Sequence, residues 1–227
     1  MNNVAFNSWE ESLLAMDVPA RLSKIMGRIY ESGLTTPSGG NCSIRAENGE
    51  IWLTPSQIDK GALSPEDMIK CDVSGKFHGK HDPTSEHPFH RLIYNKRHDV
   101  NAIVHSHPLS LVSFALSDKK PDCCLLKAIE IFCGKGNIAE YAIPGSKKLG
   151  ENVARAFDND TSWVLMKNHG IITVGRNAVE AYYRMELLER LAEIQLNAKQ
   201  LHSKTPIKYS TALINKTIDT KKPLFNN

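Results

Sequence analysis

The sequence feature that most constrains the fold is a pair of histidines directly behind an apolar run. The run from Val100 to Val104 is rich in β-branched residues and predicts a strand, and His105 and His107 extend it. Because residues i and i+2 of a strand point to the same face, both imidazoles project together. The pair therefore predicts two ligands for one metal ion.

A third histidine and a carboxylate complete a candidate ligand set. His169 lies in a second strand-like run, Trp163 to Ile172, and Glu86 lies upstream of the histidine pair. Three histidines and one acidic residue suit zinc or another divalent metal. On residues alone, a metal site and a set of unrelated structural histidines are equally supported. Most of the other histidines, which lie in polar or helical contexts, are interpreted as structural or surface residues: His78, His81, His87, His90, His98 and His202.

Composition excludes several classes of protein. The 227 residues carry a net charge of only +3 with scattered basic residues, which does not favour nucleic-acid or membrane binding. Five cysteines without CxxC spacing are typical of a reduced, cytoplasmic protein. We expect no signal peptide, and no apolar run approaches the ~20 residues needed to span a bilayer.

The remaining pattern alternates helices and strands. Asp17 predicts a helix start and Gly33 its end, and Asn48-Gly49 predicts a hairpin between two short strands. Further helices are expected over about 85–98, 109–116 and 178–201 and behind Ser146, and a strand over 137–142. The last helix has an expected apolar stripe of Tyr183, Leu187, Leu191 and Ile194. The pattern favours a single α/β domain over residues 1–227, with a tail at 203–227.

Two turns and one lysine have alternative interpretations. Backbone amides of Ser38-Gly39-Gly40-Asn41 suit a phosphate, but the turn can equally lead into a hairpin. Thr84-Ser85 can bind an anion at a helix start or simply cap the helix. Lys167 is either a Schiff-base lysine or, as we favour, a residue on the opposite face from His169.

These motifs, in this order, resemble the class II aldolase/adducin family, and most closely its L-fuculose-1-phosphate aldolase branch. The resemblance covers roughly residues 18–200. Five motifs carry it: Ser38-Gly39-Gly40-Asn41, Thr54-Pro55-Ser56, Thr84-Ser85-Glu86, His105-Ser106-His107 and Asn168-His169-Gly170. No single motif is specific to the family, but five motifs in the correct order with compatible spacing are.

The resemblance implies a three-layer α/β/α sandwich with a mostly antiparallel central sheet. It also implies a homotetramer with active sites at subunit interfaces and one Zn2+ per subunit, with Mn2+ or Co2+ possible. It assigns His105, His107 and His169 to the metal, and Glu86 to both the metal and acid/base catalysis. It places the substrate phosphate among Gly40, Asn41, Ser56, Thr84 and Ser85.

The implied function is metal-dependent cleavage of a phosphorylated ketose, such as L-fuculose 1-phosphate, to dihydroxyacetone phosphate and an aldehyde. Glutamate at position 86 favours this reaction over 4-epimerisation, because the related epimerases usually carry aspartate there. A decarboxylase, a dehydratase and a non-catalytic adducin-like scaffold remain alternatives.

Two positions depart from the aldolase pattern. Gln57 replaces a glycine after Ser56, which can reshape the phosphate pocket, and no tyrosine occurs in residues 126–130. Glu130 can replace that tyrosine as a proton donor, and Tyr209 can supply a C-terminal phenol.

Overall fold

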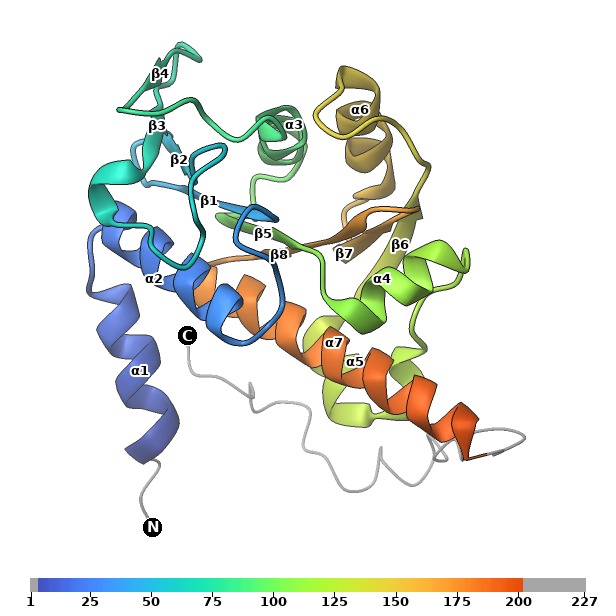
Figure 1. The fold of residues 1–227 in the computed structure, drawn as a ribbon. Coiled ribbons are helices and arrows are strands. Elements are labelled where there is room, and N and C mark those ends of the chain that lie inside the picture. The colour runs from blue at the N-terminus through green and yellow to red at the C-terminus, as the bar shows by residue number, and fades with distance from the viewer. Residues whose placement is uncertain (1–3, 202–227) are drawn as a thin grey trace.

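Eight strands form one mixed sheet, and helices cover both of its faces (Figure 1). The computed structural model describes residues 4–201. The spatial order of the strands is β4-β3-β2-β1-β5-β8-β7-β6. Every neighbouring pair is antiparallel except β6 and β7, which are parallel. The expected three-layer α/β/α arrangement with a mostly antiparallel sheet is therefore confirmed.

The helices and strands have the following bounds. The strands are β1 (Asn41–Arg45), β2 (Ile51–Leu53), β3 (Ile69–Cys71), β4 (Phe77–His78), β5 (Ala102–Ser106), β6 (Lys135–Ala139), β7 (Thr161–Met166) and β8 (Gly170–Gly175). The α-helices are α1 (Val4–Leu14), α2 (Val18–Glu31), α3 (His87–Lys96), α4 (Leu109–Leu116), α5 (Lys127–Cys133), α6 (Lys147–Ala156) and α7 (Ala178–Gln200). Two 3-10 helices are η1 (Pro65–Asp67) and η2 (Cys123–Leu125). No helix within residues 4–201 is both long and apolar enough to cross a membrane.

Alternation along the central strands separates two hydrophobic cores. In β5, Ala102 and Val104 face the larger core, which also contains residues of α2, α4, α5 and α7. Ile103 faces the smaller core, which lies beneath α3 and α6 (Figure 1). Since side chains alternate along a strand, His105 lies on the same face as Ile103, toward α3. The Phe89 ring of α3 contacts the His105 ring edge-on, with 5.7 Å between centroids.

The predicted caps and turns are present. The Asp17 carboxylate accepts a hydrogen bond from the Ala20 amide at 2.8 Å and caps α2. Gly33 ends this helix with a φ of 68°, in the left-handed region that glycine tolerates best. Gly49 has a φ of 83° in the β1–β2 hairpin, where Arg45 pairs with Ile51. The hairpin prediction is therefore confirmed.

Two predictions from periodicity are wrong. The run from Trp163 to Ile172 is not one strand, because it turns between β7 and β8, and His169 lies in that turn. In α7, Tyr183 and Leu187 are only partly buried and Ile194 is 49% exposed. Leu191 is buried as predicted, but the other buried positions include Tyr182, Met185 and Leu188, which lie one or two residues away from the expected stripe. The α7 helix contacts the sheet and also α2, α4 and α5, so more than one of its sides is covered.

Several boundaries also differ from the predictions. Residues 127–133 form α5, where the sequence pattern indicates no regular element, and β6 starts two residues earlier and ends three residues earlier than predicted. The helix expected over 85–98 is the shorter α3. The helix predicted over 109–116 is confirmed as α4.

Candidate metal centre and active site

Strand β5 delivers the histidine pair to one end of the sheet. His105 is fully buried, and its Nδ1–H donates to the backbone carbonyl of Ile171 on β8 at 2.9 Å. A carbonyl can only accept, so the proton sits on Nδ1 and Nε2 is left to bind a proton or a metal ion. His107 follows just beyond β5, and the two imidazole centroids are 4.7 Å apart. The predicted same-face arrangement of the pair is therefore confirmed.

The β7–β8 turn brings the third histidine to this pair. Asn168 has a φ of 54°, a left-handed conformation that asparagine tolerates better than most residues. Gly170 allows the close approach of β8, because a Cβ there would lie 2.6 Å from the Ser106 carbonyl oxygen and 2.7 Å from His107 Cδ2. The motif Asn168-His169-Gly170 thus combines a turn former, a ligand type and a residue without a side chain.

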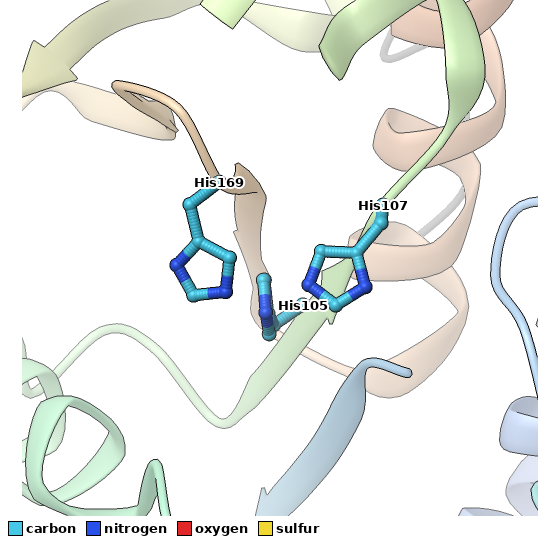
Figure 2. A group of neighbouring side chains, drawn as sticks. All are labelled: His105, His107 and His169. Carbon is cyan, nitrogen blue, oxygen red and sulfur yellow. The ribbon is translucent and has the colours of Figure 1, made fainter. Parts of the chain in front are cut away.

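The three histidines converge on one point (Figure 2). Each of them, His105, His107 and His169, offers a ring nitrogen, and these nitrogens all lie within 4.8 Å of one another. His105 Nε2 and His169 Nδ1 are buried and have no hydrogen-bond partner among the described residues. A cation would satisfy such a nitrogen, and neutral imidazoles are typical ligands of zinc and related divalent metals. The donor set therefore fits a divalent metal ion.

Glu86 lies beside the triad, at the start of α3. Its Oε2 is 3.0 Å from His105 Nε2 and its Oε1 is 3.5 Å from His169 Nε2. The 3.0 Å contact is an ion-pair distance but lacks hydrogen-bond geometry, which leaves the His105 Nε2 without a hydrogen bond. Glu86 Oε1 is likewise buried and without a hydrogen-bond partner among the described residues.

Burial and neighbouring charges set the protonation of the site. Burial lowers the pKa of His107 to about 3 and that of His169 to about 4, and His105 adds to both shifts. Burial also lowers the pKa of His105, but the Glu86 carboxylate outweighs it and raises that pKa. Burial alone would raise the pKa of Glu86, yet His105, His169 and Asn41 together hold it well below its usual range. At neutral pH the site thus holds an ionised carboxylate and two neutral imidazoles.

The predicted phosphate-binding residues come from three neighbouring segments. Gly40 has a φ of 67°, and a Cβ there would lie 2.7 Å from the His105 carbonyl oxygen. The segments that carry Ser56 and Thr84 run antiparallel, since Pro55 and Pro83 form a bridge. Thr84 is buried and accepts a hydrogen bond from the Glu86 amide at 3.3 Å, while Ser85 is exposed. Their contact with a phosphate stays a prediction.

The Asn41 side chain has other partners. It is 3% exposed, and its Nδ2 donates to Glu86 Oε2 at 2.8 Å. Its Oδ1 accepts from His90 Nε2 at 2.6 Å. Asn41 is thus tied to the acidic residue, whether or not it also contacts a phosphate.

Of the other two predicted catalytic residues, the structure describes one. Glu130 lies on α5, where its carboxylate pairs with Lys127 at 3.0 Å. Its predicted role as a proton donor remains a prediction for an assembled oligomer. Tyr209 lies outside the described residues.

The Schiff-base interpretation of Lys167 is not supported by its surroundings. Its ammonium pairs with Glu140 at 2.8 Å and Asp118 at 3.0 Å. These hydrogen-bonded carboxylates raise the pKa of Lys167, whereas an amine nucleophile needs a lowered pKa.

Three buried residues near Glu86 are not identified as site residues from the sequence: Ser43, His90 and Tyr94. Ser43 Oγ lies 2.7 Å from His90 Nδ1 and 2.8 Å from the Tyr94 hydroxyl. The spacing of Glu86, His90 and Tyr94, four residues at each step, places them on one face of a helix. That spacing is the signal by which His90 and Tyr94 could have been found, whereas Ser43 lies on β1 and is not part of it.

Comparisons with known proteins identify the family of the chain. The family model described as Class II Aldolase and Adducin N-terminal domain matches residues 20–196. An L-fuculose phosphate aldolase of Methanococcus maripaludis is 37% identical over 171 residues, which are 75% of this chain and 91% of the relative. The chain belongs to the class II aldolase/adducin family.

Other relatives act differently, according to their names. A 3-oxo-tetronate 4-phosphate decarboxylase of Haemophilus influenzae is 31% identical over 178 residues, covering 74% of this chain and 82% of the relative. Among solved structures, an L-fuculose 1-phosphate aldolase superposes with a TM-score of 0.79 at 29% identity, covering 89% of this chain and 94% of that one. The chain is therefore a class II aldolase-family member with a histidine triad suited to a divalent metal.

Proposed function

We propose that the protein is a metal-dependent aldolase that cleaves a phosphorylated ketose, such as L-fuculose 1-phosphate, to dihydroxyacetone phosphate and an aldehyde. The observation that carries this proposal is the buried Glu86 carboxylate within 3.0–3.5 Å of two of the three triad histidines. The 37% identity with a relative named L-fuculose phosphate aldolase supports the choice of substrate. Zinc is the metal we propose, held by His105, His107 and His169.

The chemistry needs a Lewis acid and a proton carrier. A divalent ion on the triad would supply the Lewis acid, which polarises the ketose carbonyl and stabilises the negative charge that cleavage leaves. We assign the proton carrier to Glu86: on cleavage of the C3–C4 bond, its carboxyl group delivers a proton to C3. In the reverse, condensing direction its carboxylate removes that proton. The lowered pKa of Glu86 favours the carboxylate form in the resting site.

The remaining proton leaves the C4 hydroxyl, whose oxygen becomes the aldehyde oxygen, and a base must accept this proton during cleavage and return it during condensation. No group near the triad within the described residues is assigned to this role, so we propose a residue from a neighbouring subunit. Glu130 and Tyr209 are the candidates. This proposal includes a homotetramer with active sites at subunit interfaces, which sedimentation analysis would test.

The test is cleavage by the Glu86→Gln variant. Glutamine keeps an oxygen that can accept from Asn41 Nδ2, so the fold is expected to persist while the proton carrier is lost. Removing a general acid/base costs about 10²–10⁴-fold in turnover. The assay couples released dihydroxyacetone phosphate to NADH oxidation, with and without EDTA. Wild-type rates in Glu86→Gln, or full activity in EDTA, would refute the assignment.

The Haemophilus influenzae relative supports decarboxylation as the second candidate. The same preparation would be offered 3-oxo-tetronate 4-phosphate, and CO2 release would be measured. Preferential CO2 release would replace the aldolase proposal and leave the metal site unaffected. Formation of a 4-epimer without aldehyde release would indicate an epimerase.

A further inference from the structure

A row of five buried polar side chains connects the smaller core to the candidate active site. The polar row runs from Tyr94 through Ser43, His90 and Asn41 to Glu86. Its successive distances are 2.8 Å, 2.7 Å, 2.6 Å and 2.8 Å. Each member is at most 7% exposed.

Two elements build the polar row. Asn41 and Ser43 are alternate residues of β1 and therefore share one face of the sheet. Glu86, His90 and Tyr94 follow one another on one side of α3, which packs over that face. The Phe89 ring stacks on the His90 ring, with centroids 4.6 Å apart and planes 22° apart, and so restricts rotation of the imidazole.

The direction of every hydrogen bond follows from the carboxylate at the end of the row. An ionised Glu86 can only accept, so Asn41 must turn its NH2 group toward it. Asn41 Oδ1 then faces His90 Nε2, which must carry the proton. Burial lowers the pKa of His90 to about 3, so the neutral ring leaves Nδ1 as an acceptor. Ser43 fills that acceptor with its hydroxyl proton.

No other arrangement of these protons gives every polar group in the row a hydrogen-bond partner. If His90 carried its proton on Nδ1, Nε2 would face Asn41 Oδ1 with two acceptors in contact. If Asn41 turned around to relieve this clash, its oxygen would face the Glu86 carboxylate. A buried polar group left unpaired costs about 1–3 kcal/mol, so both alternatives are disfavoured.

We propose that His90 is a positioning residue, which acts through Asn41 to hold the Glu86 carboxylate in its orientation toward the histidine triad. Asn41 holds Oε2, and the other oxygen, Oε1, is left without a hydrogen bond, 3.5 Å from His169 Nε2. The kinetic part of this inference rests on the proposed function. The tautomer of His90 and the resulting orientation of Asn41 do not.

Two variants of one residue separate the positioning role from simple packing. His90→Gln places an amide near the position of Nε2 and can still donate to Asn41. His90→Asn is shorter, so it keeps an acceptor for Ser43 and loses the donor to Asn41. Substitutions behind a reacting group typically cost 10–100-fold in activity. We expect His90→Asn to lower kcat by about 10–100-fold at nearly unchanged KM. We expect the loss of kcat in His90→Gln to be smaller than that in His90→Asn by a factor of at least about ten, the lower end of the same range.

A spectroscopic measurement tests the row without any turnover. Ring 15N shifts of the metal-free protein should show His90 as the neutral Nε2–H tautomer at pH 7, assigned by the signal lost in His90→Gln. The Nδ1–H tautomer would overturn the proposal. So would equal kcat losses in the two folded variants, or no loss in either.

Failure of the proposed function gives a different pattern. If wild-type protein cleaves no ketose phosphate but shows the Nε2–H tautomer, the reaction is wrong and the polar row stands. If His90→Asn does not fold, Ser43→Ala serves instead, because it removes the donor to His90 Nδ1. In Ser43→Ala, a lowered kcat together with a mixture of His90 tautomers would support the proposal. A wild-type kcat together with a single Nε2–H tautomer would overturn it.

Discussion

The most direct test of how the triad is assembled is the Gly170→Ala variant. Gly170 opens β8, directly behind His169 and beside the last residues of β5. A Cβ at this position would lie 2.6 Å from the Ser106 carbonyl oxygen, 2.7 Å from His107 Cδ2 and 3.2 Å from His105 Cε1. The added methyl group therefore meets backbone on one side and two candidate ligands on the other.

The size of the effect follows from these distances. The contact with Ser106 must lengthen from 2.6 Å to an ordinary 3.4 Å, so β8 must move about 0.8 Å away from β5. That movement separates His169, directly before β8, from His105 on β5 and from His107 just beyond β5. Overpacking of this kind costs about 1–3 kcal/mol, and the reduced entropy of the unfolded chain returns about 0.4–1 kcal/mol. We expect a net loss of about 1–2 kcal/mol and a metal affinity lowered by at least about tenfold.

The assay combines chelator competition for zinc affinity with urea unfolding of the metal-free protein. Gly27→Ala is the matched control, because Gly27 lies inside α2 and an added Cβ there would have nothing within 4 Å. Alanine in a helix interior should stabilise the protein by about 0.5–1 kcal/mol and leave zinc affinity unchanged. Wild-type zinc affinity and stability in Gly170→Ala would refute the reasoning from close approach.

Three further predictions concern pH, strain and the phosphate. The pKa values of His107 and His169, about 3 and about 4, lie below the ordinary 6.5, so the unfolded chain binds more protons. The stability that these two neutral imidazoles contribute is complete above about pH 6.5 and is lost as the pH falls toward 4. A urea midpoint that stays constant in EDTA between pH 7.5 and 4.5 would contradict this prediction. Gln57 has a φ of 57°, so Gln57→Gly should relieve about 1–2 kcal/mol of backbone strain. The greater entropy of the unfolded chain offsets about 0.4–1 kcal/mol of this gain, and the urea midpoint should still rise. A lowered midpoint would show that the Gln57 side chain makes a compensating contact. Ser85→Glu should raise the KM for a ketose phosphate strongly through like-charge repulsion, whereas Ser85→Ala removes a hydroxyl without adding charge and should raise it much less. Equal KM values for the two variants would place the phosphate elsewhere.

The triad and much of the sheet are predictable from the sequence because they depend on local rules. Alternation in β5 determines that His105 and His107 project together, and Asn48-Gly49 specifies a hairpin from its own sequence. For His169 the pattern predicts the correct site but the wrong element. An apolar run that continues through Lys167 and Asn168 resembles one strand, and only the left-handed Asn168 and the small Gly170 indicate the turn.

The polar row is not predictable from a single element. A lone histidine on a helix is usually structural, and the two partners that give His90 its role lie on β1, more than forty residues earlier. The pairing of β1 with β5 decides that Asn41 lies beside His105, and this pairing spans more than sixty residues. The α7 stripe fails for a related reason, since neighbouring helices decide which sides of a helix are buried.

The same alternation explains how a hydrophobic sheet can carry a polar site without losing its core. In β1, Cys42 and Ile44 face the larger core, while Asn41 and Ser43 face α3. A shift of one residue in the β1–β5 register would exchange these sets, burying the amide among apolar side chains and turning Cys42 and Ile44 toward α3.

Arg45 opposes such a shift at the end of β1. Its guanidinium donates to the backbone carbonyls of Tyr94, Arg97, His98 and Val100, and to the side chain of Asn101. These acceptors lie in the last turn of α3 and in its connection to β5, so one side chain fixes β1 against both elements that carry the site. Three of these hydrogen bonds, to Tyr94, Arg97 and Val100, are partly buried, and a shifted β1 would leave their acceptors unpaired at about 1–3 kcal/mol each. The position of Glu86 relative to the triad therefore depends on a contact at the opposite end of α3, where no reacting group lies.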